Sequence, residues 1–223
     1  MAKKKQEKPK KKTGKQSKKN IERQQEKILK VIVGVMIFLI IFAFVAAWFV
    51  KSRYEFEYEG FEFTKVMQGK EHYYATYIKT STKTSGMAFM NNPKDLEDIP
   101  INATLIIKTN KLMYVSLDPN MTDCEEDGAA LFNLGMFFSA IGVDVKSAWT
   151  DILFASNSSM PFKQCYNIKD DEAVIIVKEA DETKITQEGE FCYTLHVAPC
   201  DLRRATERLM IGIMTHSQGN YIQ

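Results

Sequence analysis

The sequence predicts an α+β fold, with one N-terminal transmembrane helix followed by a single mixed-sheet domain with two main helices. Three observations lead to this prediction. Residues 31–50 carry no charge, apolar and charged residues alternate from Tyr54 onward, and two later segments have helical patterns. Strand-like segments lie both before and between these helices. That order favours α+β over a doubly wound parallel sheet, in which strands and helices alternate regularly.

Residues 31–50 read VIVGVMIFLIIFAFVAAWFV and form the predicted membrane segment. Twenty helical residues reach about 30 Å, the thickness of the hydrocarbon core of a bilayer. A cleavable signal peptide has a shorter apolar stretch and an A-x-A-like cleavage site, and this run has neither. An interfacial helix needs a polar face, which is absent here. The run is therefore interpreted as an uncleaved signal-anchor within a helix over residues 21–52.

The charges on the two sides of this segment predict its orientation. Residues 1–30 contain thirteen Lys or Arg and three Glu, a net charge of +10. The rest of the chain keeps 17 of the 30 basic and 25 of the 28 acidic residues, a net charge of −8. Lysine and arginine concentrate on the cytoplasmic side of membrane segments. The N-terminus is therefore expected in the cytoplasm, and residues 53–223 outside it, in a single-pass protein of the cell membrane.

Residues 1–20 form a Lys-rich tail with no apolar residue beyond Met1 and Ala2. Such a segment cannot bury enough surface to offset the entropy of ordering, so we expect it to be disordered. Its lysines are expected to contact anionic lipid headgroups, beside their role in setting the orientation. No aromatic or arginine side chain is interleaved with them to stack on bases, so no nucleic-acid partner is expected.

The outer segment has the length of one domain and begins with strands. Alternation on both sides of Glu59-Gly60 predicts a β-hairpin with a two-residue turn. Gly189, between two glutamates, predicts a second turn, which joins the last two strands. After the first hairpin, strands are expected at residues 72–78, 87–90, 104–108, 112–117, 173–178, 184–187 and 191–197.

Two segments have the pattern of helices. The first spans about residues 124–141, with Asp123 and Glu126 as a predicted capping box and Gly142 as the C-terminal cap. The second spans about residues 201–215 and is amphipathic. Its apolar stripe is Leu202, Ala205, Leu209 and Ile213, and Arg203, Arg204, Glu207 and Arg208 are expected to face away from it. Each helix follows a tyrosine-bearing strand, a proline and a cysteine, a weak repeat that suggests two strand–helix units on one sheet.

All four cysteines, Cys124, Cys165, Cys192 and Cys200, follow the membrane segment. An even number on the outer side favours two disulfides over four buried thiols. If the two helix starts are neighbours at one sheet edge, Cys124 pairs with Cys200 and Cys165 with Cys192. If the segment around Cys165 folds back over the first helix, Cys165 pairs with Cys124. Cys192 must then reach Cys200 across a short or bent strand. Both pairings remain open at this point.

Three N-x-S/T sequons mark candidate glycosylation sites at Asn102, Asn120 and Asn157. None lies in the tail. A chain of this length contains some sequons by chance, so they give mild support to an outer domain.

Patterns of known chemistry are absent from the sequence. There is no GxSxG, P-loop, GxGxxG, HExxH or CxxC, so no catalytic or cofactor-binding residue and no cofactor is predicted. His72, His196 and His216 are scattered, which argues against a zinc site, and a structural role is favoured for His196. The acidic cluster Asp123–Asp127 could in principle hold a metal ion. Four acids at a helix N-terminus are better explained by capping and the helix dipole, and no metal site is predicted.

Three stretches resemble a family of uncharacterised archaeal single-pass membrane-anchored proteins with a four-cysteine outer domain. They are NNPKDLEDIPIN at residues 91–102, DCEEDGAALFNLG at 123–135 and EADETKITQEGEFCYTLHVAPCDLRRATERL at 179–209. The resemblance covers most of residues 54–215, including all four cysteines. It implies a prokaryotic cell membrane with the domain on the outer face of the cell. The family has no known activity, so the resemblance implies no site residues.

These observations favour a non-catalytic outer domain that binds a protein or glycan partner. The alternative is a membrane-tethered enzyme, such as a thiol-disulfide exchanger or a hydrolase with an unfamiliar site. Thiol exchange would use an accessible cysteine at a helix N-terminus, such as Cys124 or Cys200. A third hypothesis makes the protein a tether whose lysine tail recruits anionic partners in the cytoplasm.

Overall fold

The computed structural model describes residues 14–80, 83–108 and 111–217. The chain divides into two compact units, Met1–Arg53 and Tyr54–Gln223. We refer to them as the helical unit and the folded domain. The sequence analysis places the start of the folded domain at residue 53.

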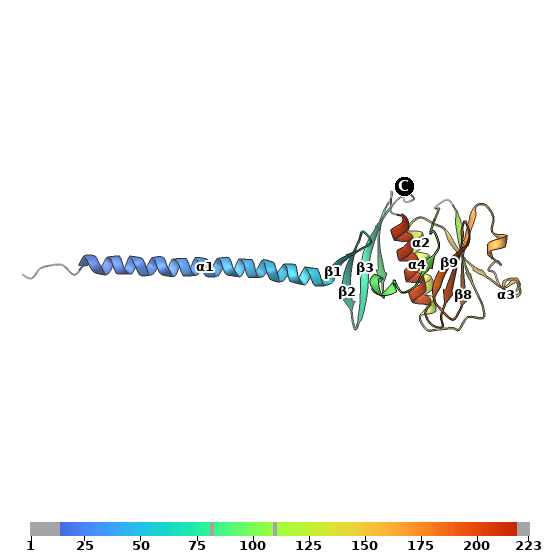
Figure 1. Ribbon diagram of the computed structural model, residues 1–223, viewed down its shortest axis with the longest axis horizontal. Coiled ribbons are helices and arrows are strands. Elements are labelled where there is room, and N and C mark those ends of the chain that lie inside the picture. The colour runs from blue at the N-terminus through green and yellow to red at the C-terminus, as the bar shows by residue number, and fades with distance from the viewer. Residues whose placement is uncertain (1–13, 81–82, 109–110, 218–223) are drawn as a thin grey trace, which may run out of the picture. The chain divides into compact units, whose positions relative to one another are not determined.

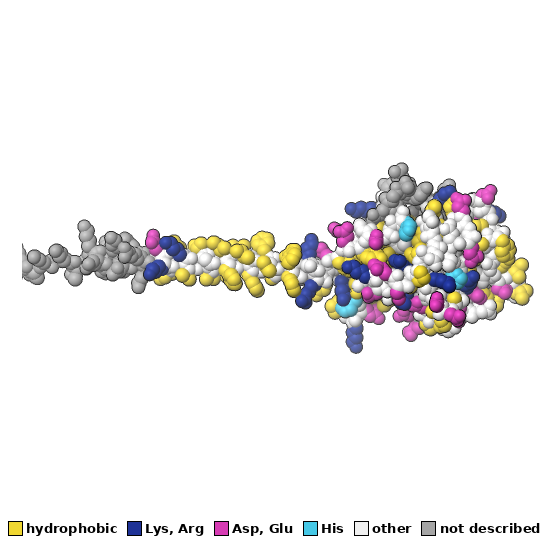
Figure 2. Space-filling view, in the orientation of Figure 1, with side chains coloured by type: hydrophobic (Ala, Val, Ile, Leu, Met, Phe, Trp, Pro, Cys, Tyr) yellow, Lys and Arg dark blue, Asp and Glu magenta, His cyan; other side chains and the backbone are white. Residues whose placement is uncertain are grey.

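The helical unit contains α1 (Gly14–Tyr54). Its segment Glu26–Tyr54 is long and apolar enough to cross a membrane, and hydrophobic side chains surround it (Figure 2). The helix begins at Gly14 rather than near residue 21. Lysine and glutamine are good helix formers, and extending a helix costs far less than starting one. Residues 14–20, expected to be disordered, are therefore helical, and the rest of the predicted disordered tail lies outside the described residues.

The folded domain begins with an antiparallel sheet in the order β1-β2-β3-β4. Its strands are β1 (Glu55–Tyr58), β2 (Phe61–Gln68), β3 (Glu71–Lys79) and β4 (Thr84–Phe89). The hairpin predicted at Glu59-Gly60 is confirmed. These residues have φ values of 49° and 79°, the left-handed conformation that a two-residue hairpin turn requires. Phe63, Ile78 and Phe89 form the buried face of this sheet.

Within the described residues, a second sheet has the strand order β5-β9-β10-β8-β6-β7. Its strands are β5 (Ile101–Asn102), β6 (Leu112–Leu117), β7 (Val145–Trp149), β8 (Glu172–Glu179), β9 (Lys184–Gly189) and β10 (Cys192–Val197). Strands β10, β8, β6 and β7 are parallel, β9 is antiparallel to β10, and β5 pairs with β9 in parallel. The sheet is therefore mixed, as predicted.

Two long helices, α2 (Asp127–Ala140) and α4 (Leu202–Ser217), pack against each other between the two sheets (Figure 1). Strand β6 leads into α2 and β10 into α4, so both predicted strand–helix units lie on one sheet. The helices cover the inner face of the mixed sheet, and the central core lies around them. We call the opposite side of the mixed sheet its outer face.

The predicted capping box of α2 is wrong. The helix begins at Asp127, and its N-cap is Glu126, whose side chain makes no capping hydrogen bond. That carboxylate pairs instead with Arg203 of α4, with 2.8 Å between Oε2 and Nε. At the other end, Gly142 has a φ of 82° just after the helix, as the C-terminal cap prediction requires.

The apolar stripe predicted for α4 is buried, but the prediction that Glu207 faces away from the core is wrong. Glu207 is 2% exposed. Its carboxylate accepts hydrogen bonds from the backbone N–H groups of Met90 and Asn91, at 2.8 and 3.0 Å, and from the Asn91 side-chain amide. It fastens the chain after β4 to the helix, just before the 3-10 turn η1 (Pro93–Leu96).

The strand predicted at residues 104–108 is absent from the described residues. Leu105 and Ile107 are buried, which explains the strand-like pattern. Their backbone, however, meets a side chain rather than a neighbouring strand. The hydroxyl of buried Tyr193 accepts from the Ile106 N–H and donates to the Ile106 carbonyl, both at 2.9 Å. Strand β7 was not predicted from the sequence, because Lys146 and Ser147 interrupt the apolar residues of its short pattern VKSAW.

Candidate functional site

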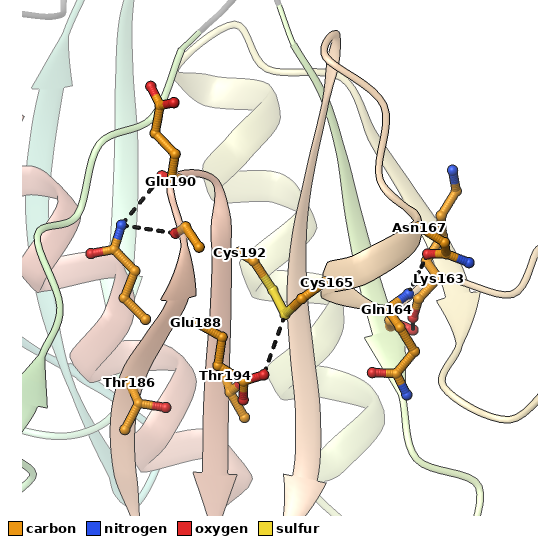
Figure 3. Close-up of a disulfide and its surroundings, with 12 residues drawn as sticks. Lys163, Gln164, Cys165, Asn167, Thr186, Glu188, Glu190, Cys192 and Thr194 are labelled. Carbon is orange, nitrogen blue, oxygen red and sulfur yellow. Dashed lines mark hydrogen bonds between the residues drawn. A yellow bond between two sulfur atoms is a disulfide. The ribbon is translucent and has the colours of Figure 1, made fainter.

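The four cysteines form two disulfides, Cys124–Cys200 and Cys165–Cys192, each with 5.5 Å between the Cα atoms. Of the two pairings that the sequence left open, this is the one in which the helix starts are neighbours. Cys124 precedes α2 and Cys200 precedes α4, so the first disulfide joins the two strand–helix units. The second joins the segment between β7 and β8 to the first residue of β10 (Figure 3).

The segment between β7 and β8, residues 150–171, forms a long loop with two short helices, α3 (Ile152–Ser156) and η2 (Cys165–Asn167). Its middle returns to the edge of the sheet. The Trp149 N–H donates to the Pro161 carbonyl at 2.9 Å, and the Lys163 N–H donates to the Trp149 carbonyl at 3.0 Å. The buried Ser116 hydroxyl holds the Lys163 carbonyl at 2.7 Å. The loop thus acts as a short additional strand at the edge of β7.

A buried ion pair between Lys163 and Glu172 fastens the end of this loop to the start of β8. The Lys163 ammonium also lies 4.6 Å from the ring centre of Tyr114. Burial alone would raise the pKa of Glu172, but hydrogen bonds from Lys163 and from the Lys169 backbone hold that pKa below its ordinary value. The carboxylate therefore stays ionised. A single sequence carries no sign of this pair, because the two residues look like ordinary surface charges.

The fastened loop exposes four large apolar side chains, Ile152, Leu153, Phe154 and Tyr166. Ile152 and Leu153 are 63% and 69% exposed, and Tyr166 is 79% exposed. We call these four residues the apolar loop surface. Three of them belong to α3, which lies at the end of the folded domain opposite β1–β4 (Figure 1), where Figure 2 shows hydrophobic side chains at the surface. Water-facing aliphatic and aromatic groups in one loop are typical of a binding surface.

The backbone beneath this surface is ordered by capping interactions. Asp151 is the N-cap of α3, and its carboxylate accepts from the N–H groups of Leu153 and Phe154 at 2.7 and 3.1 Å. The Phe154 ring packs against Trp149, with 5.9 Å between ring centres. A reciprocal pair of hydrogen bonds between Gln164 and Asn167 closes η2 beside Tyr166. The exposed side chains are therefore presented by a preorganised loop, which limits the entropy lost on binding.

The acidic cluster at residues 123–127 has structural partners. Glu126 pairs with Arg203, and the Asp127 carboxylate accepts from the Cys124 N–H at 3.2 Å. In the part of the chain that the structure describes, no group of three or more His, Cys, Asp or Glu side chains is arranged to hold a metal ion. Within the cluster, Asp127 stabilises the start of α2 and Glu126 stabilises its contact with α4.

One arrangement resembles part of a catalytic site. The Thr186 hydroxyl and His196 Nε2 on adjacent strands of the outer face lie 3.0 Å apart. A nucleophile and base need a third group to orient the imidazole. Among the described residues, Thr186 is the only hydrogen-bond partner of the His196 ring, so no such acid is present. Desolvation, together with the positive charges of Lys178 and Lys184, lowers the pKa of His196.

Thiol chemistry finds little support in the surroundings of the cysteines. Both pairs are closed disulfides. Cys124 lies among four acidic residues, whose negative charge opposes formation of a thiolate. The second disulfide also lies beside an acid, since Cys165 Sγ is 3.5 Å from Glu188 Oε2 (Figure 3).

The three sequon asparagines, Asn102, Asn120 and Asn157, are all exposed. Asn157 ends α3 within the loop and donates to the Leu153 carbonyl at 3.0 Å. Comparisons with known protein families, with curated proteins and with solved structures found no match for the chain. The functional argument therefore depends on the geometry of the folded domain itself.

Proposed function

We propose that this protein is a membrane-anchored binding module, whose extracytoplasmic domain binds a protein partner through the apolar loop surface. The observation that carries the proposal is the contrast within residues 150–171. A disulfide, a buried ion pair and two capped turns fasten the loop, yet Ile152, Leu153 and Tyr166 face water. Such side chains cost solubility and add nothing to the core, so a binding role explains them.

The membrane location is supported by α1, and the orientation by charge. The apolar segment of α1 is preceded by a net charge of +10, which favours a cytoplasmic N-terminus. Disulfides persist in oxidising spaces outside the cytoplasm, and both disulfides belong to the folded domain. In this arrangement the Lys-rich tail contacts anionic lipid headgroups on the cytoplasmic side.

The chemistry of the loop favours a protein over a glycan. Ile152 and Leu153 have no hydrogen-bonding groups, whereas a sugar presents mainly hydroxyls that need polar partners. Protein interfaces bury aliphatic and aromatic anchors such as these in apolar pockets. Tyr166 adds a ring and one hydroxyl, a combination that is enriched at protein interfaces.

The proposal is tested with the full-length protein carrying Leu153→Ser and Tyr166→Ser. Native membranes are solubilised in a nonionic detergent, and complexes are separated on native gels. Because each anchor contributes about 1–2 kcal/mol, the double variant should reduce complex formation by about tenfold or more. Tyr77→Ser is the matched control, since Tyr77 is 69% exposed on β3.

A complex that survives the double variant unchanged, or that is lost equally in Tyr77→Ser, contradicts the proposal. The melting temperature of each variant is measured in parallel, because these exposed positions should leave stability within about 0.5 kcal/mol of the wild type. A complex with the mass of two chains would identify the partner as a second copy.

A further inference from the structure

Three basic side chains form a row across three adjacent strands on the outer face of the mixed sheet. The register pairs His196 of β10 with Lys178 of β8 on one side and with Lys184 of β9 on the other. All three alternate with core residues of their strands, so they project from the same face. Each is partly exposed. We call Lys178, His196 and Lys184 the basic row.

The basic row is electrostatically unfavourable when His196 is protonated, because a lysine lies directly opposite the ring on the neighbouring strand at each side. The three side chains also stand out in a region with a net charge of −8. Glu188, the nearest acid, offsets only part of this charge. Its carboxylate lies 3.8 Å from Lys178, but it also accepts from the Thr194 hydroxyl and contacts Cys165.

We propose that the basic row binds an oxyanion, a phosphate or sulfate group, over His196. Locally unfavourable arrangements that persist in a folded protein are typical of functional sites. Lysine ammonium groups bind such anions as point charges, and their flexible stems adapt to them. This proposal does not rest on the binding role proposed for the apolar loop surface.

The spacing of the strands suits a single anion. Adjacent strands lie about 4.8 Å apart, so the Lys178 and Lys184 backbones are about 10 Å apart with His196 between them. Both ammonium groups can therefore converge on one group above the imidazole. Thr186 lies 3.0 Å from Nε2, so in the protonated ring Nδ1 carries the N–H group that remains to donate to the anion. Lys178, Lys184 and Glu188 are the charged groups that act on the ring. Desolvation and then the two lysines lower the pKa of His196, so a bound anion should raise it.

The experiment measures binding of inorganic sulfate to the full-length protein in nonionic detergent, by calorimetry and by NMR of the histidine rings. Sulfate stays dianionic between pH 5 and 8, so any pH dependence belongs to the protein. Binding should strengthen as the pH falls, and saturation with sulfate should raise the pH at which His196 titrates. Lys178→Gln and Lys184→Gln should each weaken binding about threefold to fivefold. His196→Gln should remove the pH dependence.

Lys146→Gln is the matched control, since Lys146 is an exposed lysine on the outer face of β7. The proposal is overturned if sulfate leaves the His196 signals unchanged, or if Lys146→Gln weakens binding as much as the two row variants. Dextran sulfate in a second arm identifies the source of the anion. Tighter binding per sulfate group, lost in the same variants, indicates an anionic polymer, and equal binding indicates a small anion.

Discussion

Two buried polar side chains, Tyr193 and Glu207, hold backbone segments that lack a neighbouring strand. Tyr193 forms hydrogen bonds with the backbone of Ile106 in the irregular segment before β6. Glu207 accepts hydrogen bonds from the backbone of the residues that follow β4. In the described residues of both segments these side chains, and no neighbouring strand, accept the hydrogen bonds of the backbone N–H groups. The sequence predictions were wrong at both places. The consecutive apolar residues Leu105–Ile107 suggested a strand at 104–108, and neighbouring arginines suggested an exposed Glu207.

Replacing Tyr193 by Phe should destabilise the folded domain by about 1–3 kcal/mol. The change keeps the ring but leaves the N–H and C=O of Ile106 without their hydroxyl partner. Denaturant unfolding of the full-length protein in detergent measures the free energy of unfolding. Tyr77→Phe, at an exposed ring, is the control and should change it by less than about 0.5 kcal/mol. Equal effects of the two changes would show that the Tyr193 hydroxyl has no special role.

Glu207 should make stability depend on pH. Burial raises the pKa of Glu207 above its ordinary value of 4.5, against the hydrogen bonds from Met90 and Asn91 that lower it. A raised pKa means that the folded state binds the proton more tightly than the unfolded state. The resulting stabilisation is complete below pH 4.5 and is lost as the pH rises through the folded-state pKa.

The Glu207→Gln variant lacks this titration. The difference in unfolding free energy, wild type minus variant, should therefore increase as the pH is lowered from 7 toward 4.5. Parallel denaturation curves at several pH values give this difference. A difference that decreases over the same range would mean that burial does not dominate the pKa of Glu207.

At the scale of elements, two disulfides perform different tasks. Cys124–Cys200 closes 76 residues and joins the starts of α2 and α4, whereas Cys165–Cys192 closes 27 residues and holds the loop 150–171. The chain-entropy model assigns them about 4.5 and about 3.5 kcal/mol. The larger contribution to stability thus comes from the disulfide that is remote from the apolar loop surface.

Replacing Cys165 and Cys192 by Ala should expose the loop to proteolysis. We expect trypsin to cleave after Lys163 or Lys169 in this variant, as mass spectrometry of the fragments would show. The Cys124→Ala and Cys200→Ala pair is the control and should leave those two sites protected while the domain remains folded. Equal protection in both variants would show that the ion pair and caps alone hold the loop.

The sequence predicted the elements that have strong local signals. The hairpin at Glu59-Gly60 needs left-handed residues, and α4 buries the stripe that its spacing predicts. The candidate site escaped prediction, because long-range pairing creates it. Strand β7 is held in the sheet by pairing with β6. The loop is fastened through Lys163 by Ser116 and Glu172, which lie outside the loop in the sequence. The basic row likewise exists only through the register of three strands.

At the scale of the whole molecule, the charge asymmetry predicts which unit is outside the cell. In intact cells, a membrane-impermeant protease should digest the folded domain and leave an N-terminal tag protected, because the +10 segment retains the N-terminus in the cytoplasm. Permeabilised cells provide the control, in which the tag is also digested. Protection of the folded domain in intact cells would contradict the prediction and indicate the opposite orientation.

Site-specific photocrosslinking in native membranes tests the central claim most directly. A photoreactive amino acid replaces Leu153 in one sample and Tyr77, an equally exposed position on β3, in the other. Our account predicts a discrete crosslinked protein from residue 153, lost when Tyr166→Ser is added, and none from residue 77. No crosslinked protein from residue 153, or the same products from both positions, would contradict it.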